Sequence, residues 1–353
     1  MTQVSPTMVK FTTFQNILPT AVPKLENLLD SFTQGRVLVI GDLTLDEFLT
    51  GQVERLSREA PVLILRHEHT KQIPGGGANA VYNLAKLGAQ VKVAGFLGKD
   101  PQGEALKTIF DSAGIDTKGI LIDPHSTTVT KTRIAGHARQ SVTQQIVRVD
   151  RKPETLPNLE MQMQLAEYIR SQLPHVDAVV CSDYGDGVFT SPVIEAALSH
   201  PLTIVDTQKD LHRYQGATIF TPNLPEAESA VGYGIETPES LAQAGEDLLN
   251  LTQAKKILIT RGEEGMSLFS RDGEGINHEQ IPAFNRTDVF DVTGAGDTVV
   301  AALTLSLCAG SSFWQGAVLG NLAASLVVRQ FGTATTSVSQ IKEALATLLA
   351  ELG

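Results

Sequence analysis

The stretch from Asp291 to Asp297 carries the clearest chemical signal, because it places three small residues before a run with helical spacing. Gly294, Ala295 and Gly296 would leave backbone N–H groups accessible at a helix start, where the positive end of the helix dipole favours an anion. The carboxylate of Asp297 would lie beside that anion and could accept a proton from a hydroxyl that attacks phosphorus. Taken alone, the stretch equally allows a plain strand-to-helix turn with Asp297 as an acid of the first helical turn.

A second glycine-rich stretch, residues 75–79, enters a segment that has helical spacing and ends near Gly88. It formally matches the G-x-G-x-x-A pattern of dinucleotide-binding turns, so a nicotinamide dehydrogenase is one interpretation. That pattern belongs directly after a strand and requires an acidic residue about 20 positions further on. Here no acid stands in the corresponding stretch, Lys92 to Gly95. The surroundings of the motif therefore argue against a dinucleotide site.

Two further carboxylates, Asp42 and Asp46, directly follow the apolar run Val37 to Ile40. Ligands of open α/β sheets bind beyond the carboxyl ends of the strands. Carboxylates at that position can accept hydrogen bonds from a polyol. The alternative is a pair of acids that cap the next element.

The rest of the chain predicts the elements that position these residues. Apolar runs alternate with helical patterns, which is typical of a doubly wound, mostly parallel α/β sheet. Five runs that are apolar on both faces fit buried strands, at 37–40, 178–181, 202–205, 218–220 and 257–259. Two β-rich pieces, 50–71 and 127–149, depart from this alternation and predict a small separate sheet, the second piece as an antiparallel hairpin.

Composition restricts the class of protein. The chain has 353 residues, 42% of them hydrophobic, and its 28 basic and 39 acidic residues give a net charge of −11. This balance argues against a nucleic-acid binder, which needs a basic face. No run approaches the roughly 20 apolar residues that span a membrane, and the first 34 residues do not resemble a targeting segment. Two cysteines, Cys181 and Cys308, favour a reducing, cytoplasmic compartment.

Taken together, the motifs resemble those of the ribokinase-like (PfkB) carbohydrate kinases, from about residue 35 to the C-terminus. That family has G-G-x-x-N entering a helix, here 75–79, and D-T-G-A-G-D in the last third, here 291–297. Within the family, stretches such as GDLTLDEF, SDYGDGV and TPNLPEAE are similar to kinases of heptose 7-phosphate. The resemblance implies a ribokinase-like α/β fold over 35–353, an N-terminal extension over 1–34, and a β-sheet lid from about 47–72 and 127–150.

The resemblance also implies an ATP-dependent sugar kinase that uses Mg²⁺ and a monovalent cation such as potassium. Its catalytic base would be Asp297, and its anion hole the amides of Gly294, Ala295 and Gly296. The residues expected to contact the sugar are Asp42, Asp46, Gly75, Gly76, Asn79, Lys131 and Arg133. The residues expected to line the nucleotide are Asn223, Glu226, Thr260, Gly262 and Asn321. Glu226 would organise Mg²⁺ through water, and Asp291, Thr293 and Gly332 would bind the monovalent cation. The expected partners are a sugar or sugar phosphate and a second copy joined through the lid, with no nucleic acid and no membrane.

Three departures concern the substrate. Asp186 and Gln208 stand where heptose-phosphate kinases have lysines, and Ser141-Val142-Thr143 replaces S-R-N next to an insertion of about six residues. Each lost positive charge removes a charge-assisted hydrogen bond worth about 1.5–3 kcal/mol. Heptose 7-phosphate, phosphorylated at its anomeric hydroxyl, is therefore one candidate. Unphosphorylated fructose or ribose, a nucleoside, and a catalytically silent sugar or nucleotide sensor on the same fold are the alternatives.

Overall fold

The computed structural model describes residues 14–138, 142–273, 275–284, 289, 291–330 and 332–352. Over these residues the largest element is a nine-stranded sheet in the order β13-β12-β11-β10-β9-β8-β1-β4-β5. Its strands are β1 (Arg36–Gly41), β4 (Gln90–Gly98), β5 (Asp116–Asp123), β8 (Ala178–Asp183), β9 (Thr203–Thr207), β10 (Ile219–Phe220), β11 (Lys256–Thr260), β12 (Met266–Asp272) and β13 (Gly275–Ile281). The strands from β11 to β5 pair in parallel, and β12 and β13 add an antiparallel edge. The predicted doubly wound, mostly parallel sheet is confirmed.

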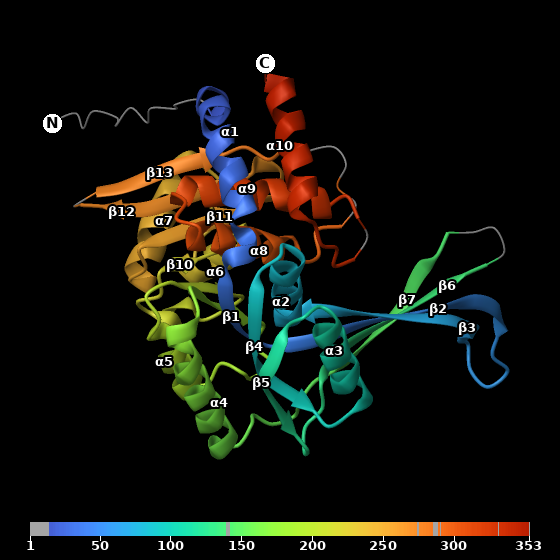
Figure 1. Cartoon of the computed structure of the whole chain (residues 1–353). Coiled ribbons are helices and arrows are strands. Elements are labelled where there is room, and N and C mark those ends of the chain that lie inside the picture. The colour runs from blue at the N-terminus through green and yellow to red at the C-terminus, as the bar shows by residue number, and fades with distance from the viewer. Residues whose placement is uncertain are drawn as a thin grey trace.

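Helices cover both faces of this sheet (Figure 1). One layer consists of α1 (Phe14–Asp30), α2 (Gly77–Lys86), α3 (Pro101–Ser112), α8 (Ala295–Cys308), α9 (Phe313–Val327) and α10 (Val338–Leu352). The other consists of α4 (Leu159–Gln172), α5 (Ser191–Leu198), α6 (Leu224–Val231) and α7 (Pro238–Thr252). Short 3₁₀ segments lie at Phe32–Gln34, Leu173–His175, Leu211–Tyr214 and Gly262–Glu264.

Strand β1 shows why the run from Val37 to Ile40 is apolar at every position. Val37 and Val39 pack into the core under the first helical layer, and Leu38 and Ile40 pack into the core under the second. All four side chains are fully buried. Because successive side chains of a strand alternate between faces, a strand covered twice needs apolar residues at every position.

The second sheet has four strands in the order β3-β2-β6-β7 and projects to one side of the body (Figure 1). Its strands are β2 (Leu43–Leu56), β3 (Leu63–Gly76), β6 (Val129–His137) and β7 (Gln144–Arg151). We call this the lid sheet. The first piece forms one pair of long antiparallel strands rather than several short ones, and the predicted hairpin of the second piece is confirmed as β6 and β7. Only Asp42 separates β1 from β2, so the chain passes directly from the main sheet into the lid sheet.

Helix α1 was not predicted as an element. Leu18, Val22, Leu25 and Leu29 lie on one helical face and are buried against the first layer. Pro19 and Pro23 stand inside the helix and interrupt the pattern that would have indicated it. In the described part of the chain, no helix is both long and apolar enough to cross a membrane.

Candidate functional site

Asp297 lies in the first turn of α8, where its side chain is 3% exposed. Its Oδ2 accepts a hydrogen bond from Nδ2 of Asn79 at 2.7 Å, and the hydroxyl of Tyr184 lies 3.3 Å from each carboxylate oxygen. Burial raises the pKa of Asp297 to about 7, although these two donors and the charge of Lys131 act to lower it. A carboxylate with this pKa can change protonation state near neutral pH, as a general base must.

The turn before α8 is shaped by Gly294, which has a positive φ of 78°. A Cβ at this position would lie 2.5 Å from Nδ2 of Asn79, so the glycine also makes room for the partner of Asp297. The amide of Ala295 donates to the carbonyl of Val292 at 3.2 Å. The spacing of small residues predicts three free amides in this turn, but that of Ala295 has an internal partner.

The glycines of the stretch 75–79 also make room for a carboxylate. Gly75 pairs with Thr44 at the end of β3, and a Cβ on Gly75 would overlap the carboxylate of Asp46. Gly76 has a positive φ of 51°, which turns the chain into α2. The motif thus serves close packing around the predicted sugar residues, with Asn79 in the first turns of α2.

The lid sheet contributes Asp46, Lys131 and Arg133. Nη1 of Arg133 lies 2.6 Å from Oδ1 of Asp46, and both side chains are largely buried. Nζ of Lys131 lies over the ring of Tyr184, 5.6 Å from its centroid. Lys131 and Asp46 act in opposite directions on the pKa of Asp297, which they respectively lower and raise. The structure therefore brings the predicted sugar residues of the lid sheet to the predicted base.

Asp42 is 1% exposed, and its carboxylate accepts hydrogen bonds from backbone amides. Its Oδ2 accepts from the amides of Tyr184 at 2.8 Å and Asp186 at 3.1 Å, and its Oδ1 accepts from the amide of Val188 at 3.0 Å. Burial, and next the charge of Asp183, raise the pKa of Asp42 to about 7. With both oxygens on the loop 184–188, Asp42 holds the segment that carries Tyr184.

We expect Asp42→Ala to lower the free energy of unfolding by about 3 kcal/mol, because three buried amides lose their acceptor. Chemical denaturation measures this loss. Thr108→Ala is the control, since that exposed hydroxyl bonds only to its own helix. A stability equal to that of the control would show that Asp42 does not hold the loop.

A cavity of about 160 Å³ opens beside Asp297. Its lining residues come from the carboxyl ends of β8, β9 and β11, from α6 and from the turn before α8, and include Asp206, Asn223, Glu226, Thr260 and Gly296. Asn223 and Glu226 also form the capping box of α6. Burial, followed by the charges of Asp297 and Glu226, raises the pKa of Asp206 well above its ordinary value. Burial also raises the pKa of Glu226.

Two residues of this site were missed by the sequence analysis. Tyr184 directly follows the parallel strand β8, and Asp206 is the last residue but one of the parallel strand β9. Both line the cavity beside the predicted base. The rule that ligands bind beyond the carboxyl ends of parallel strands could have found both, because each follows a run that was recognised as a buried strand.

Two predicted nucleotide residues lie elsewhere. Gly262 begins a 3₁₀ segment with φ 55° and does not line the cavity. Asn321 lies in α9, where its Nδ2 donates to the carbonyl of Pro282 at 2.8 Å. This bond uses one of the two N–H groups of the amide.

The three residues predicted to bind a monovalent cation are brought together. Oδ1 of Asp291 accepts from the amide of Thr293, and Oδ2 accepts from the amide of Gly332, both at 2.9 Å. Among the described residues, no group of three His, Cys, Asp or Glu side chains is arranged to hold a metal ion.

The residues at which this sequence departs from heptose-phosphate kinases have contacts of their own. Oδ1 of Asp186 lies 2.6 Å from Nζ of Lys152, while its other carboxylate oxygen is buried without a hydrogen bond. Gln208 lines the cavity beside Asp297. Ser141, the first residue of the third departure, lies outside the described residues.

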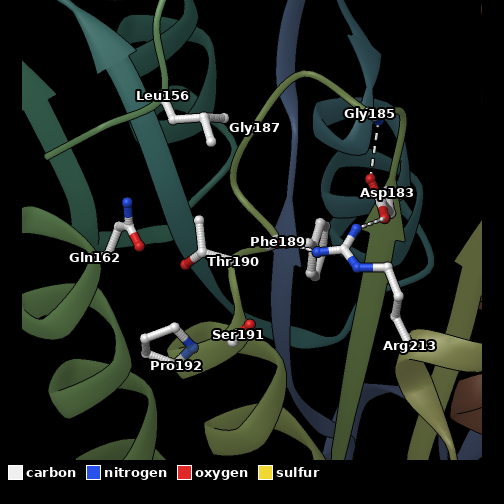
Figure 2. Close-up of a pocket in the computed structure, with 10 residues that line it drawn as sticks. All are labelled: Leu156, Gln162, Asp183, Gly185, Gly187, Phe189, Thr190, Ser191, Pro192 and Arg213. Atoms are coloured by element: carbon white, nitrogen blue, oxygen red, sulfur yellow. Dashed lines mark hydrogen bonds and ion pairs between the residues drawn. The ribbon is translucent and has the colours of Figure 1, made fainter. Parts of the chain in front are cut away.

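A second cavity, of about 430 Å³, is lined in part by Gly185 and Gly187 of the loop that Asp42 holds. Figure 2 shows Arg213 reaching toward Phe189 and Asp183 at this place, with Gly185 above the Asp183 carboxylate. Asp183 contributes to both cavities. Asp42 and Asp183 therefore both accept hydrogen bonds from backbone amides of this loop.

Comparison with known proteins gives a family and a fold. The sequence profile described as "pfkB family carbohydrate kinase" matches residues 34–340. The bifunctional protein HldE of Desulfatibacillum aliphaticivorans is 40% identical over 321 residues, which are 89% of this chain and 64% of that protein. HldE of Gluconobacter oxydans is 37% identical over 333 residues, 92% of this chain and 67% of that protein. The chain thus spans about two thirds of the length of these curated relatives.

Solved structures agree on the fold. Phosphofructokinase-2 from Escherichia coli in complex with potassium superimposes with a TM-score of 0.69 at 21% identity, covering 89% of this chain and 99% of that one. Ribokinase from Arabidopsis thaliana complexed with ribose and ATP gives 0.67 at 21% identity, covering 89% and 98%.

Proposed function

We propose an acceptor and a mechanism for this chain, which belongs to the pfkB family of carbohydrate kinases and is therefore an ATP-dependent sugar kinase. The γ-phosphoryl group of ATP passes to a hydroxyl of a sugar or sugar phosphate, with the anomeric hydroxyl of heptose 7-phosphate as the first candidate. The similarity of GDLTLDEF, SDYGDGV and TPNLPEAE to kinases of that sugar supports this acceptor. Residues 35–353 form the kinase unit in this proposal, and the lid sheet covers its site.

The observation that carries the mechanism is the buried Asp297 between the lid residues and the acidic cavity. Asp297 takes the proton of the attacking hydroxyl, while Asn79 and Tyr184 hold its carboxylate in place. The amides of Gly294 and Gly296 receive the charge that develops on the transferring group, while that of Ala295 donates to the carbonyl of Val292. Asp46, Gly75, Gly76 and Asn79, with Lys131 and Arg133, orient the sugar, and closure of the lid sheet keeps water from competing with it.

The donor set beside Asp297 fits a divalent cation. Asp206 and Glu226 are partly buried carboxylates in one cavity, and the charge of Glu226 disfavours ionisation of Asp206, a cost that a bound cation would remove. We assign them to Mg²⁺, which usually keeps waters and takes only one or two carboxylates together with substrate phosphates. Bound Mg²⁺ neutralises the charge of the phosphates. Asn223 and Thr260 line the same cavity and contact the nucleotide, and Asp291, Thr293 and Gly332 supply oxygens for potassium.

We further propose that two copies join through the lid sheet in the cytoplasm. Strand β7 is exposed along its whole length and carries Ile146, Val147 and Val149. An exposed apolar strand at a sheet edge needs a cover.

Activity is expected to fall at acidic pH. Asp297 acts as a base only when ionised, and burial raises its pKa to about 7. Below pH 7, kcat/KM should therefore fall about tenfold per pH unit, and it should reach a plateau above pH 8. Steady-state rates between pH 5 and 9 in saturating Mg²⁺ test this. An acidic limb centred below pH 5 would show that the limiting base is a different group.

A panel of acceptors tests the substrate. Heptose 7-phosphate, fructose, ribose and adenosine are compared at equal concentrations by coupled ADP release, with sugar-free reactions subtracted. We expect the highest kcat/KM with heptose 7-phosphate. A preference for fructose or ribose would favour the second candidate, a kinase of unphosphorylated sugars, which is supported by the acidic Asp186 and the neutral Gln208. No turnover on any of them would favour a sensor.

A further inference from the structure

A closed ring of buried hydrogen bonds connects α2 and α8 behind the carboxylate of Asp297. Asn79 donates to Asp297, and its Oδ1 accepts from Nδ2 of Asn83 at 3.0 Å. Oδ1 of Asn83 in turn accepts from Oγ1 of Thr298 at 3.0 Å. Because Thr298 follows Asp297 in the chain, the peptide bond between these two residues closes the ring. All four side chains are at most 3% exposed.

While Asp297 is ionised, the ring allows only one orientation of the Asn79 amide. If this amide were rotated by 180°, its oxygen would face the carboxylate of Asp297, and its NH₂ group would face the NH₂ group of Asn83. Asn83 is fixed in the same way, because its Nδ2 also donates to the backbone carbonyl of Asn79 at 3.0 Å while its oxygen faces the Thr298 hydroxyl. Two buried groups without partners would result from rotating either amide.

We propose that Asn83 and Thr298 are positioning residues that act through Asn79 to hold the Asp297 carboxylate in its reactive direction. Within the described part of the chain, the hydrogen bonds of the Asn83 and Thr298 side chains reach each other, Asn79 and the carbonyl of Gly294, and no other residue that we assign to the sugar or the nucleotide. Loss of the ring should therefore reduce turnover and leave substrate affinity nearly unchanged. This inference rests on the proposed function, in which Asp297 is the base.

Thr298 offers a matched pair of variants. Thr298→Val keeps the shape but removes the hydroxyl, and we expect it to lower kcat about fivefold to tenfold with KM within twofold. Thr298→Ser keeps the hydroxyl and should restore kcat to within twofold of the wild type. A loss of kcat in Thr298→Ser equal to that in Thr298→Val would contradict the proposal, because Thr298→Ser keeps the hydroxyl.

Asn83→Leu removes the middle of the ring, and we expect about a thirtyfold loss of kcat with KM again within twofold. Because both changes break one ring, the double variant Asn83→Leu/Thr298→Val should be no slower than Asn83→Leu alone. Losses that multiply, an unchanged kcat, or a rise of KM that accounts for the loss would each overturn the proposal. Should Asn83→Leu fail to fold, the Thr298 pair decides the question alone.

Asp297→Asn, measured in parallel, separates the two levels of the argument. If Asp297→Asn is inactive while the ring variants keep their kcat, only the ring is contradicted. If Asp297→Asn turns over normally, the assignment of Asp297 as the base is wrong, and so is the proposal that Asn83 and Thr298 position a base.

Discussion

Asp297→Asn is expected to lower kcat at least a hundredfold, which is the scale of losing a positioned general base. The substitution preserves shape, and its side-chain oxygen can still accept from Asn79, but the amide cannot take a proton from the sugar hydroxyl. Affinity for ATP should change little, because we propose that the nucleotide is held by the cavity walls and the turn amides. Steady-state kinetics gives kcat, and calorimetry gives the affinity for ATP.

Asp247 provides a matched control for this substitution. Like Asp297, it accepts from a tyrosine hydroxyl and a side-chain amide, those of Tyr233 and Gln243, at 2.7 and 3.0 Å. It lies in α7 and is not part of the site. Asp247→Asn should leave kcat unchanged. A variant of Asp297 that keeps normal turnover would remove Asp297 from the mechanism.

Gly294→Ala should have the second-largest effect, about a hundredfold loss of kcat. A Cβ at this position would lie 2.5 Å from Nδ2 of Asn79, so either the turn or the partner of Asp297 must move. A displacement of this size at a reacting group costs about two orders of magnitude in rate. The positive φ of 78° should also lower the free energy of unfolding by about 1–2 kcal/mol.

Gly232→Ala separates the two effects of Gly294→Ala. Gly232 caps α6 with a similar φ of 81°, and a Cβ there would meet no atom within 4 Å. We expect Gly232→Ala to lose similar stability in chemical denaturation and to keep its kcat. If both variants lost equal activity, backbone strain rather than the contact with Asn79 would explain the result.

The main sheet and the segment around Asp297 could be predicted from sequence because their signals are local. A strand covered on both faces must be apolar at each position, as β1 is from Val37 to Ile40. The turn before Asp297 likewise shows its small residues in one short stretch. Helix α1 escaped prediction because Pro19 and Pro23 stand inside it, although Leu18, Val22, Leu25 and Leu29 keep helical spacing.

Contacts between distant segments could not be predicted from spacing. Asp42 follows a buried strand and was expected at the sugar, yet both its oxygens hold a loop more than 140 residues away. Asn321 is predicted at the nucleotide, and spacing could not show that its Nδ2 also donates to the carbonyl of Pro282. Gly294 is interpreted from sequence by the backbone amides that it leaves accessible, and Gly75 by its motif. The atoms nearest to a Cβ at these positions belong to Asp46 and Asn79, so both glycines also make room for side chains from elsewhere in the chain.

The most direct test of the central claim is to follow ATP, Mg²⁺ and each acceptor of the panel by ³¹P NMR, with the wild type and Asp297→Asn side by side. The wild type should convert the γ-phosphate signal into ADP and a sugar-phosphate ester with at least one acceptor, and Asp297→Asn should form that ester at least a hundredfold more slowly. ADP formed together with inorganic phosphate but no ester, or an ester formed equally fast by both proteins, would contradict the account.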